Sequence, residues 1–235
     1  MLGSTSEVAQ AICRDLGQRG CRRFHLVARD LHRNGQIARE LQERFSAIVS
    51  MEQTDLLSIG SAQAEEFPRV GDFDLYLITA GSLGDAELAR QDASEALRIT
   101  AANYSGLIPW LTAIATTERL AMPGRLWVFS SVAADRGRPS NYHYGAAKAA
   151  LAAFCEGLLL RCHGKPFSVR VLKAGYMASP MTAGKVSPAL CAAPAVVAQD
   201  LLRRPNRRGI EYIPWWWSPL MRLVRLLPAP LVHKL

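Results

Sequence analysis

The sequence predicts a doubly wound α/β fold, in which helices cover both faces of a parallel sheet. Three observations support this prediction: short apolar runs alternate with longer helical patterns, a turn of small residues stands near the N-terminus, and no linker rich in Pro, Gly or Ser divides the 235 residues. Parallel strands that are covered on both faces read as continuous apolar runs. Because 49% of the residues are hydrophobic, the chain is long enough to bury one substantial core.

The first helix is expected at residues 6–18, because Val8, Ile12 and Leu16 recur at helical spacing and Gly20 follows as a stop. The same periodicity predicts helices at residues 30–45, 93–120, 142–162 and 193–202. Short apolar runs predict buried strands at residues 24–28, 47–51, 74–79, 126–130 and 168–173. In sheets of this kind, ligands bind at the carboxyl ends of the strands.

The N-terminus is short for this fold, because only Met1 and Leu2 precede Gly3. We expect the central first strand to be truncated there, whether the start codon lies upstream or the chain is a fragment. A chain that lacks most of a central strand should be less stable than its full-length relatives. We predict one domain at residues 1–212, with the candidate sites, and a Trp-rich amphipathic tail at residues 213–235.

Composition narrows the class of protein. The net charge of +8 suits nucleic acid, an anionic membrane surface or phosphorylated ligands, but no basic stretch with interleaved aromatics resembles a nucleic-acid module. Five cysteines without a CxxC pair indicate reduced thiols, and five scattered histidines give no support to a metal site. Neither a signal peptide nor an apolar run of about 20 residues is present. We expect a cytoplasmic protein with no nucleic-acid partner.

Two positions in the first third of the chain indicate a dinucleotide. The segment from Gly3 to Ala9 stands where a strand would turn into a helix, and its small residues would let backbone N–H groups approach a pyrophosphate. A Ser-rich helix cap is the alternative. The next strand ends at Ala28, so no carboxylate stands there to accept hydrogen bonds from the adenosine ribose hydroxyls. Arg29 follows, and its guanidinium favours a 2′-phosphate and therefore NADP over NAD. A surface arginine at the start of the next helix is the alternative.

The strongest motif is formed by Tyr144 and Lys148, which are preceded by Ser131 at the end of an apolar strand. Helical residues four apart share one face, so the ammonium can lie beside the phenol. The lysine would favour the phenolate, and the serine hydroxyl would hold the carbonyl oxygen that receives the proton.

On these residues the sequence resembles the classical short-chain dehydrogenase/reductase family over essentially the whole chain. Ser131 stands thirteen positions before Tyr144, Asn103 to Gly106 is similar to the NxxG motif, and Thr79 to Gly81 is similar to the NAG strand end. The resemblance implies a Rossmann fold and a catalytic tetrad of Asn103, Ser131, Tyr144 and Lys148, with Asn103 holding a water of the proton relay. The expected cofactor-binding residues are Gly3, Ser4, Thr5, Ser6, Val8, Arg29, Asp55, Leu56, Ala80, Gly81, Tyr144, Lys148, Gly175, Met177 and Ser179.

The sequence departs from the family pattern at three places. Glu7 and Ala9 replace two glycines of the fingerprint, Ala174 stands where the family has proline before Gly175, and Ser179 replaces the loop threonine. The turn at residues 3–9, Gly84-Asp85 and the tail are similar to one subgroup, the decaprenylphospho-ribose 2-keto reductases.

Together these features predict an NADPH-dependent reduction of a ketone to a secondary alcohol, on an apolar or lipid-linked keto-sugar substrate. A reductase of unrelated small ketones and a non-catalytic membrane- or partner-binding protein are the alternatives. Clustered tryptophans beside a cationic amphipathic helix suit a membrane interface, so residues 213–235 are expected to contact a membrane surface, or else to cover the substrate cleft or a dimer partner. The resemblance implies a homodimer or homotetramer.

Overall fold

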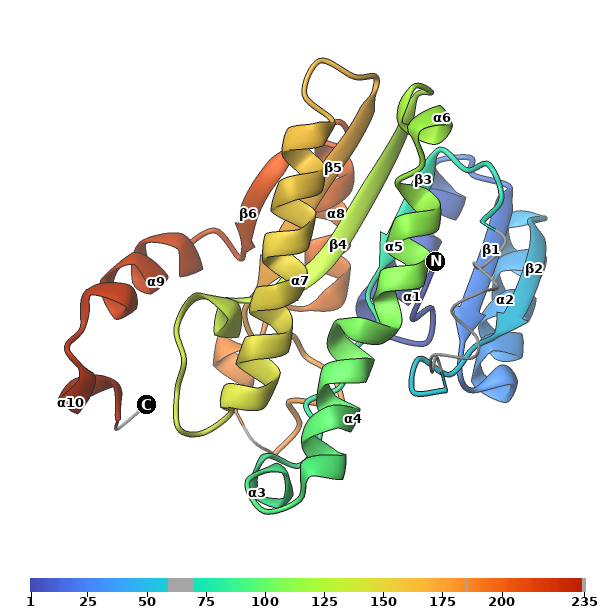
Figure 1. Cartoon of the computed structure of the whole chain (residues 1–235). Helices are drawn as coiled ribbons and strands as arrows, with labels where there is room; N and C mark the ends of the chain where they lie inside the picture. Colours follow the sequence, from blue (N-terminus) through green and yellow to red (C-terminus); the bar gives the residue numbers. More distant parts are fainter. Residues whose placement is uncertain (59–69, 185, 234–235) are drawn as a thin grey trace. The chain divides into compact units, whose positions relative to one another are not determined.

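The computed structural model describes residues 1–58, 70–184 and 186–233, coloured along the sequence in Figure 1. The chain forms two compact units, which are described separately. Unit 1 comprises Met1–Asp55, Tyr76–Ala80 and Tyr176–Arg207, and unit 2 comprises Leu56–Leu75, Gly81–Gly175 and Arg208–Leu235.

Unit 1 contains parallel strands with helices packed beside them. Strand β1 (Arg23–Ala28) pairs in parallel with β2 (Ile48–Gln53), from Arg23↔Ile48 to Ala28↔Gln53. Leu2 bridges in parallel to both Val27 and Ile78, so Met1 and Leu2 take the place expected for the central first strand. The elements of this unit are α1 (Glu7–Gln18), β1 (Arg23–Ala28), α2 (Leu31–Phe45), β2 (Ile48–Gln53), most of β3 (Leu75–Ile78), the 3₁₀ turn η3 (Pro188–Leu190) and α8 (Pro194–Arg203).

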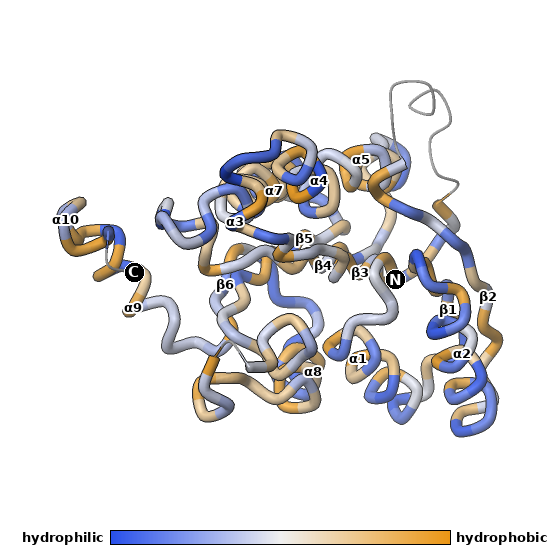
Figure 2. The backbone as a smooth tube through the Cα atoms, turned by 90° about the horizontal axis from the view of Figure 1, so that it is seen from below, coloured by the Kyte–Doolittle hydropathy of each residue, from blue (hydrophilic) through white to orange (hydrophobic). Residues whose placement is uncertain are grey.

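The helices of unit 1 begin where capping chemistry predicts. Ser6 accepts a hydrogen bond from Ala9 N, and Asp30 accepts one from Arg33 N, so each side chain satisfies a backbone donor that the first helical turn leaves free. Pro194 occupies the first position of α8. In the view of Figure 2, α1 and α2 lie on the same side of β1. Buried apolar residues of both helices form one cluster with those of β1.

Unit 2 is built on three parallel strands, β4 (Gly124–Ser131), β5 (Phe167–Ala174) and β6 (Gly209–Ile213). Strands β4 and β5 are buried over most of their length, as their continuous apolar runs predict. Helix α7 lies in front of β4 and β5 in Figure 1. The other elements are α3 (Ala86–Ala89), α4 (Ala93–Asn103), η1 (Ser105–Leu107), α5 (Ile108–Ile114), α6 (Thr117–Leu120), η2 (Val132–Asp135), α7 (Tyr142–Arg161), α9 (Trp217–Leu226) and α10 (Ala229–Val232).

The structure corrects two sequence predictions. The single helix expected at residues 93–120 is broken into α4, η1, α5 and α6. Pro109 has no backbone N–H for a continuing helix, and a side chain at Gly106 would overlap the carbonyl of Leu56, so the chain turns there. Strand β6 was missed, although Ile210 and Tyr212 alternate with polar residues directly after Gly209.

Candidate active site

Two adjacent serines at the end of β4 have different partners. Ser130 Oγ donates to the backbone carbonyl of Lys148 at 2.9 Å and so fixes α7 to the strand. Ser131 is the last residue of β4, and its Oγ accepts a hydrogen bond from Ala133 N at 3.1 Å. The hydroxyl of Ser131 retains its proton for a further partner, which makes it the serine suited to hold a substrate oxygen.

Tyr144 and Lys148 lie one turn apart on α7, as their spacing predicts. Lys148 Nζ lies 5.9 Å from the centre of the Tyr144 ring and donates to the Phe129 carbonyl at 3.2 Å. Burial lowers the pKa of Lys148 to about 8. Burial also raises the pKa of Tyr144, while a hydrogen bond with Ser131 and the charge of Arg138 act in the opposite direction. The structure thus brings the three predicted side chains of the proton-transfer motif together in unit 2.

Asn103, the fourth predicted residue, is completely buried at the end of α4. Its Nδ2 donates to the carbonyls of Ser82 and Ile99 at 2.6 and 2.8 Å, and its Oδ1 accepts from Ser82 N at 3.2 Å. One amide hydrogen and the amide oxygen of Asn103 therefore hold the loop after Gly81, and the other hydrogen bonds within α4. A Cβ at Gly81 would lie 2.7 Å from Asn103 Oδ1 and 3.0 Å from Lys148 Nζ, so this glycine lets the loop pass close to both side chains.

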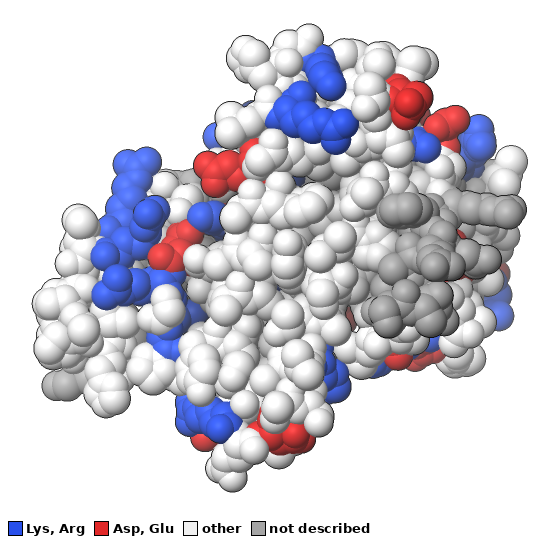
Figure 3. All heavy atoms as spheres, in the orientation of Figure 1, with Lys and Arg blue, Asp and Glu red and all other residues white. Residues whose placement is uncertain are grey.

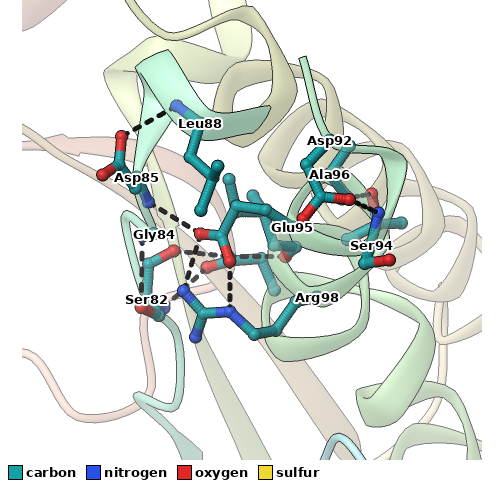
Figure 4. A network of polar contacts seen from close by, with 12 residues as sticks. Ser82, Gly84, Asp85, Leu88, Asp92, Ser94, Glu95, Ala96 and Arg98 are labelled. Atoms are coloured by element: carbon teal, nitrogen blue, oxygen red, sulfur yellow. Dashed lines mark hydrogen bonds and ion pairs between the residues drawn. The ribbon is translucent and has the colours of Figure 1, made fainter. Parts of the chain in front are cut away.

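The loop after Gly81 is held by a network that the sequence motifs did not reveal, shown in Figure 4. Glu95 accepts hydrogen bonds from Asp85 N at 2.7 Å and from both Arg98 Nε and Nη2 at 2.5 and 2.6 Å. The Arg98 guanidinium, followed by the Asp85 N–H, lowers the pKa of Glu95 to about 2. Gly84 has a φ of +65°, and a side chain at this position would overlap the side chains of Ile99 and Glu95. The network stabilises one conformation of the loop beside Asn103.

A second polar network holds the far end of η2. Asp135 pairs with Lys173 of β5 and accepts a hydrogen bond from Tyr212 of β6 at 2.7 Å. The Asp135 side chain is 1% exposed, and a buried carboxylate requires such partners. Ser131 stands at the other end of η2, so both ends of this short turn are fixed. Sequence analysis missed all three residues because they lie on separate elements.

In unit 1, Gly3 adopts φ of +86°, and a Cβ there would lie 2.5 Å from Ala80 N. Both facts require glycine at the predicted turn. Ser4 is buried, and its Oγ donates to Asn34 Oδ1 at 2.7 Å, while Asn34 Nδ2 donates to the Leu26 carbonyl at 3.0 Å. Asn34 was not predicted, although a buried asparagine on the apolar face of α2 is a signal for such a contact.

The start of α1 retains free backbone donors. Within the described residues, Ala9 N donates to Ser6 Oγ, whereas the N–H groups of Glu7 and Val8 have no recorded acceptor. Such donors at a helix N-terminus suit a phosphate. Glu7 places a carboxylate there, but Arg33 lies 3.9 Å from it and partly balances its charge.

The two arginines beside this turn have different settings. Arg29 is exposed directly after β1, and the neighbouring Asp30 is committed to capping α2. Arg33 Nη2 donates to the Thr5 carbonyl at 3.3 Å, which places a second guanidinium at the Gly3 turn. The predicted arginine is therefore joined by one that sequence analysis did not identify.

The remaining predicted cofactor residues lie on loops. Asp55 follows β2, and Leu56 packs against Gly106. Gly175 N donates to the Ile213 carbonyl at 2.8 Å, and a side chain at Gly175 would overlap the indole of Trp217. Two other loop contacts involve Thr182, whose Oγ1 donates to the Met177 carbonyl at 2.5 Å and accepts from Ser179 N at 3.3 Å.

Comparison with known proteins gives the family. A family model described as short chain dehydrogenase matches residues 1–189. An uncharacterized oxidoreductase of Mycobacterium tuberculosis is 35% identical over 175 residues, which cover 74% of this chain and 70% of that protein. Another, from Streptomyces coelicolor, is 33% identical over 239 residues, which cover 100% of this chain and 94% of that protein.

Solved structures show the same fold. A short-chain dehydrogenase from Sphingobium yanoikuyae in complex with NADPH matches with a TM-score of 0.79 at 19% identity, over 97% of this chain and 95% of that one. The bulky-bulky ketone specific alcohol dehydrogenase from Comamonas testosteroni matches with a TM-score of 0.78 at 19% identity, over 97% and 94%. The predicted doubly wound α/β fold is thereby confirmed, and the chain is an oxidoreductase that belongs to the short-chain dehydrogenase/reductase family.

Proposed function

We propose that this oxidoreductase is an NADPH-dependent reductase that converts a ketone to a secondary alcohol. The observation that carries the proposal is the cluster of Ser131, Tyr144 and Lys148, in which the buried ammonium lies 5.9 Å from the centre of the phenol ring and the serine hydroxyl is close enough to lower the pKa of the phenol. Family membership and the NADPH bound to the Sphingobium relative support the reaction type and the cofactor.

The residues of each unit fit a dinucleotide. In unit 1, the Gly3 turn and the free N–H groups of α1 would hold its pyrophosphate, and Arg29 with Arg33 would hold a 2′-phosphate. In unit 2, Lys148 would hold the nicotinamide ribose. When bound, NADPH supplies the hydride that reduces the carbonyl carbon.

The protein supplies the proton. Tyr144 donates its phenolic proton to the carbonyl oxygen, which Ser131 orients through its hydroxyl. Lys148 lowers the free energy of the resulting phenolate by its positive charge. The clamp that Asn103 forms on the loop after Gly81 maintains the position of this loop beside Lys148.

A titration with NADPH, and separately with NADH, tests the cofactor by nicotinamide fluorescence. We expect saturable binding that prefers NADPH, and loss of that preference in Arg29→Ala combined with Arg33→Ala. Tyr144→Phe should bind NADPH normally and should not oxidise it with any ketone. Failure of the folded protein to bind either nucleotide would contradict the proposal.

Activity measured on a series of ketones tests the substrate class. We propose an apolar or lipid-linked ketone, because exposed apolar side chains gather on the C-terminal segment: Trp215, Leu223 and Leu226 are 77%, 59% and 82% exposed. Activity that rises with acyl chain length would support this class, whereas equal activity on small ketones would favour the alternative reductase.

A membrane surface is the second element of the proposal. Helix α9 buries Trp217 and Met221 and exposes Leu223 and Leu226, with Arg222 on a neighbouring side. This pattern is typical of a helix that lies in a lipid interface, and Figure 2 shows the apolar residues of α9 and α10. Within the described residues, no helix is long and apolar enough to cross a bilayer.

Co-sedimentation with vesicles of phosphatidylglycerol and phosphatidylcholine tests this contact. We expect Leu223→Gln with Leu226→Gln to reduce binding about tenfold, while Leu160→Gln, a change at a 70% exposed leucine of α7, has no effect. Unchanged vesicle binding together with loss of a dimer would instead assign this face to a second copy of the chain.

A further inference from the structure

Four arginines of unit 2 carry charges that no carboxylate among the described residues pairs with: Arg136, Arg138, Arg222 and Arg225. Two of them stand between η2 and α7, and two stand on α9. Residues 136–155 and 212–233 contain no Asp or Glu. Figure 3 shows Lys and Arg side chains gathered beside α9 on the face in view. This side of unit 2 is therefore electrostatically suited to an anion.

Arg138 differs from the other three because one nitrogen of its guanidinium group is buried without a hydrogen-bond partner among the described residues. This atom is Nε, which is inaccessible to solvent. In contrast, Arg136 Nη2 donates to the Leu227 carbonyl at the end of α9. A buried donor without an acceptor costs about 1–3 kcal/mol. Such a donor is expected to persist where a ligand satisfies it.

The position of Arg138 connects it to the reacting centre. Its charge is close enough to Tyr144 to lower the pKa of the phenol. The segment that carries Arg138 is fixed, because the Arg138 carbonyl accepts from Asn141 N at 3.2 Å and Arg90 Nη2 donates to the Pro139 carbonyl at 2.7 Å. Arg138 therefore stands on an ordered segment next to the proton donor.

In the part of the chain that the structure describes, no carboxylate forms an ion pair with this guanidinium. Asp135, the nearest acid in sequence, is paired with Lys173 and Tyr212. Glu87, on the neighbouring α3, pairs with Arg90. A guanidinium binds carboxylate and phosphate with two parallel hydrogen bonds, so a ligand anion of this kind would complete the site.

We propose that Arg138 binds an anionic group, a carboxylate or a phosphate, on the substrate near its ketone. Arg222 and Arg225 supply a positive field from α9 that attracts the same group. The inference rests on the proposed ketone reduction and names one chemical feature of its substrate. Arg138 is a specificity residue, whereas Ser131, Tyr144 and Lys148 perform the reaction on any ketone that reaches them.

A matched pair of ketones tests the inference by activity. We would measure NADPH oxidation with 3-oxocyclohexane-1-carboxylate and with its neutral methyl ester. We expect the wild-type protein to prefer the carboxylate by about tenfold or more in kcat/KM, and Arg138→Gln to lose this preference through KM while retaining the rate on the ester. Arg138→Lys should recover part of it, and Arg39→Gln, an equal charge change at an exposed position of α2, should leave it intact.

A second measurement detects anion binding at Arg138 without turnover. Inorganic phosphate, added to protein saturated with NADP⁺, should raise the Tm by about 3–6 °C at ten times its dissociation constant in wild type and in Tyr144→Phe, and by much less in Arg138→Gln. Protection by vesicles of phosphatidic acid in place of free phosphate would indicate a lipid-borne anion at the same site. Equal protection of wild type and Arg138→Gln, or equal use of acid and ester by the wild type, would overturn the inference. Loss of turnover on both ketones with phosphate protection retained would contradict the proposed reaction and leave the anion site supported.

Discussion

Replacement of Lys148 by methionine should make the protein more stable at neutral pH while it removes activity. Lys148 is 4% exposed, and burial lowers its pKa from 10.5 to about 8. A buried ammonium without a carboxylate partner disfavours folding. Methionine fills a similar volume without a charge.

The magnitude follows from the pKa. A change from 10.5 to about 8 corresponds to roughly 3 kcal/mol of unfavourable interaction of the charged form in the folded state. The variant loses the hydrogen bond from Lys148 Nζ to the Phe129 carbonyl, worth about 1 kcal/mol. We expect Lys148→Met to increase the free energy of unfolding by about 2 kcal/mol at pH 7.

The sign of the pH dependence provides the sharper test. Between about pH 8 and 10.5 the unfolded lysine holds a proton that the folded one has released, so the destabilisation that Lys148 causes decreases as the pH rises through this window. Burial raises the pKa of Cys13 and Cys155 to about 12, and these thiols lower stability above about pH 9 in both proteins. The difference in the free energy of unfolding between Lys148→Met and the wild type should therefore become smaller as the pH rises from 7 to 10.

Urea denaturation without cofactor at pH 7, 8.5 and 9.5 measures this difference. Lys165→Met, in the turn after α7, serves as a control for the loss of one lysine. A Lys148→Met variant that is less stable than wild type at pH 7, or a gap that does not change with pH, would refute the reasoning.

Three further changes test the surroundings of the site. Glu95 stabilises the fold only while its low-pKa carboxylate is ionised, so the wild type should lose stability as the pH falls from about 4.5 to about 2. Glu95→Gln should lack this part of the loss, and urea midpoints measured across this pH range would show the difference. Gly81→Ala should lower the free energy of unfolding by about 1–3 kcal/mol and reduce NADPH oxidation, because its Cβ would crowd Asn103 and Lys148; unchanged values would contradict that packing. Asn34→Ala should lower the free energy of unfolding by about 1 kcal/mol, because the buried Ser4 hydroxyl loses its 2.7 Å acceptor and retains only the Val27 carbonyl at 3.2 Å. It should also weaken NADPH binding in a fluorescence titration, and full affinity would separate Asn34 from the Gly3 turn.

Much of the fold was predictable because it depends on local patterns. The starts of α1 and α2 follow from the capping residues Ser6 and Asp30, and β4 and β5 follow from continuous apolar runs. The break within residues 93–120 was not predicted, because the packing of Gly106 against Leu56 involves residues that are distant in sequence. Strand β6 was missed because five residues with partial burial give a weak pattern.

The sequence by itself indicated the chemistry that we propose for the site: Tyr144 and Lys148 stand one helical turn apart, and Ser131 ends an apolar strand, as proton transfer to a carbonyl oxygen would need. Only the tertiary structure decided which side chains support them. Asn34 meets Ser4 across 30 positions, and Asn103 meets Ser82 across 21. The sequence also could not show that Arg138 has no carboxylate partner among the described residues, because ion pairs depend on packing. Helical spacing is local and repeats along the chain, whereas burial and hydrogen-bond partners depend on which distant segments the fold brings into contact.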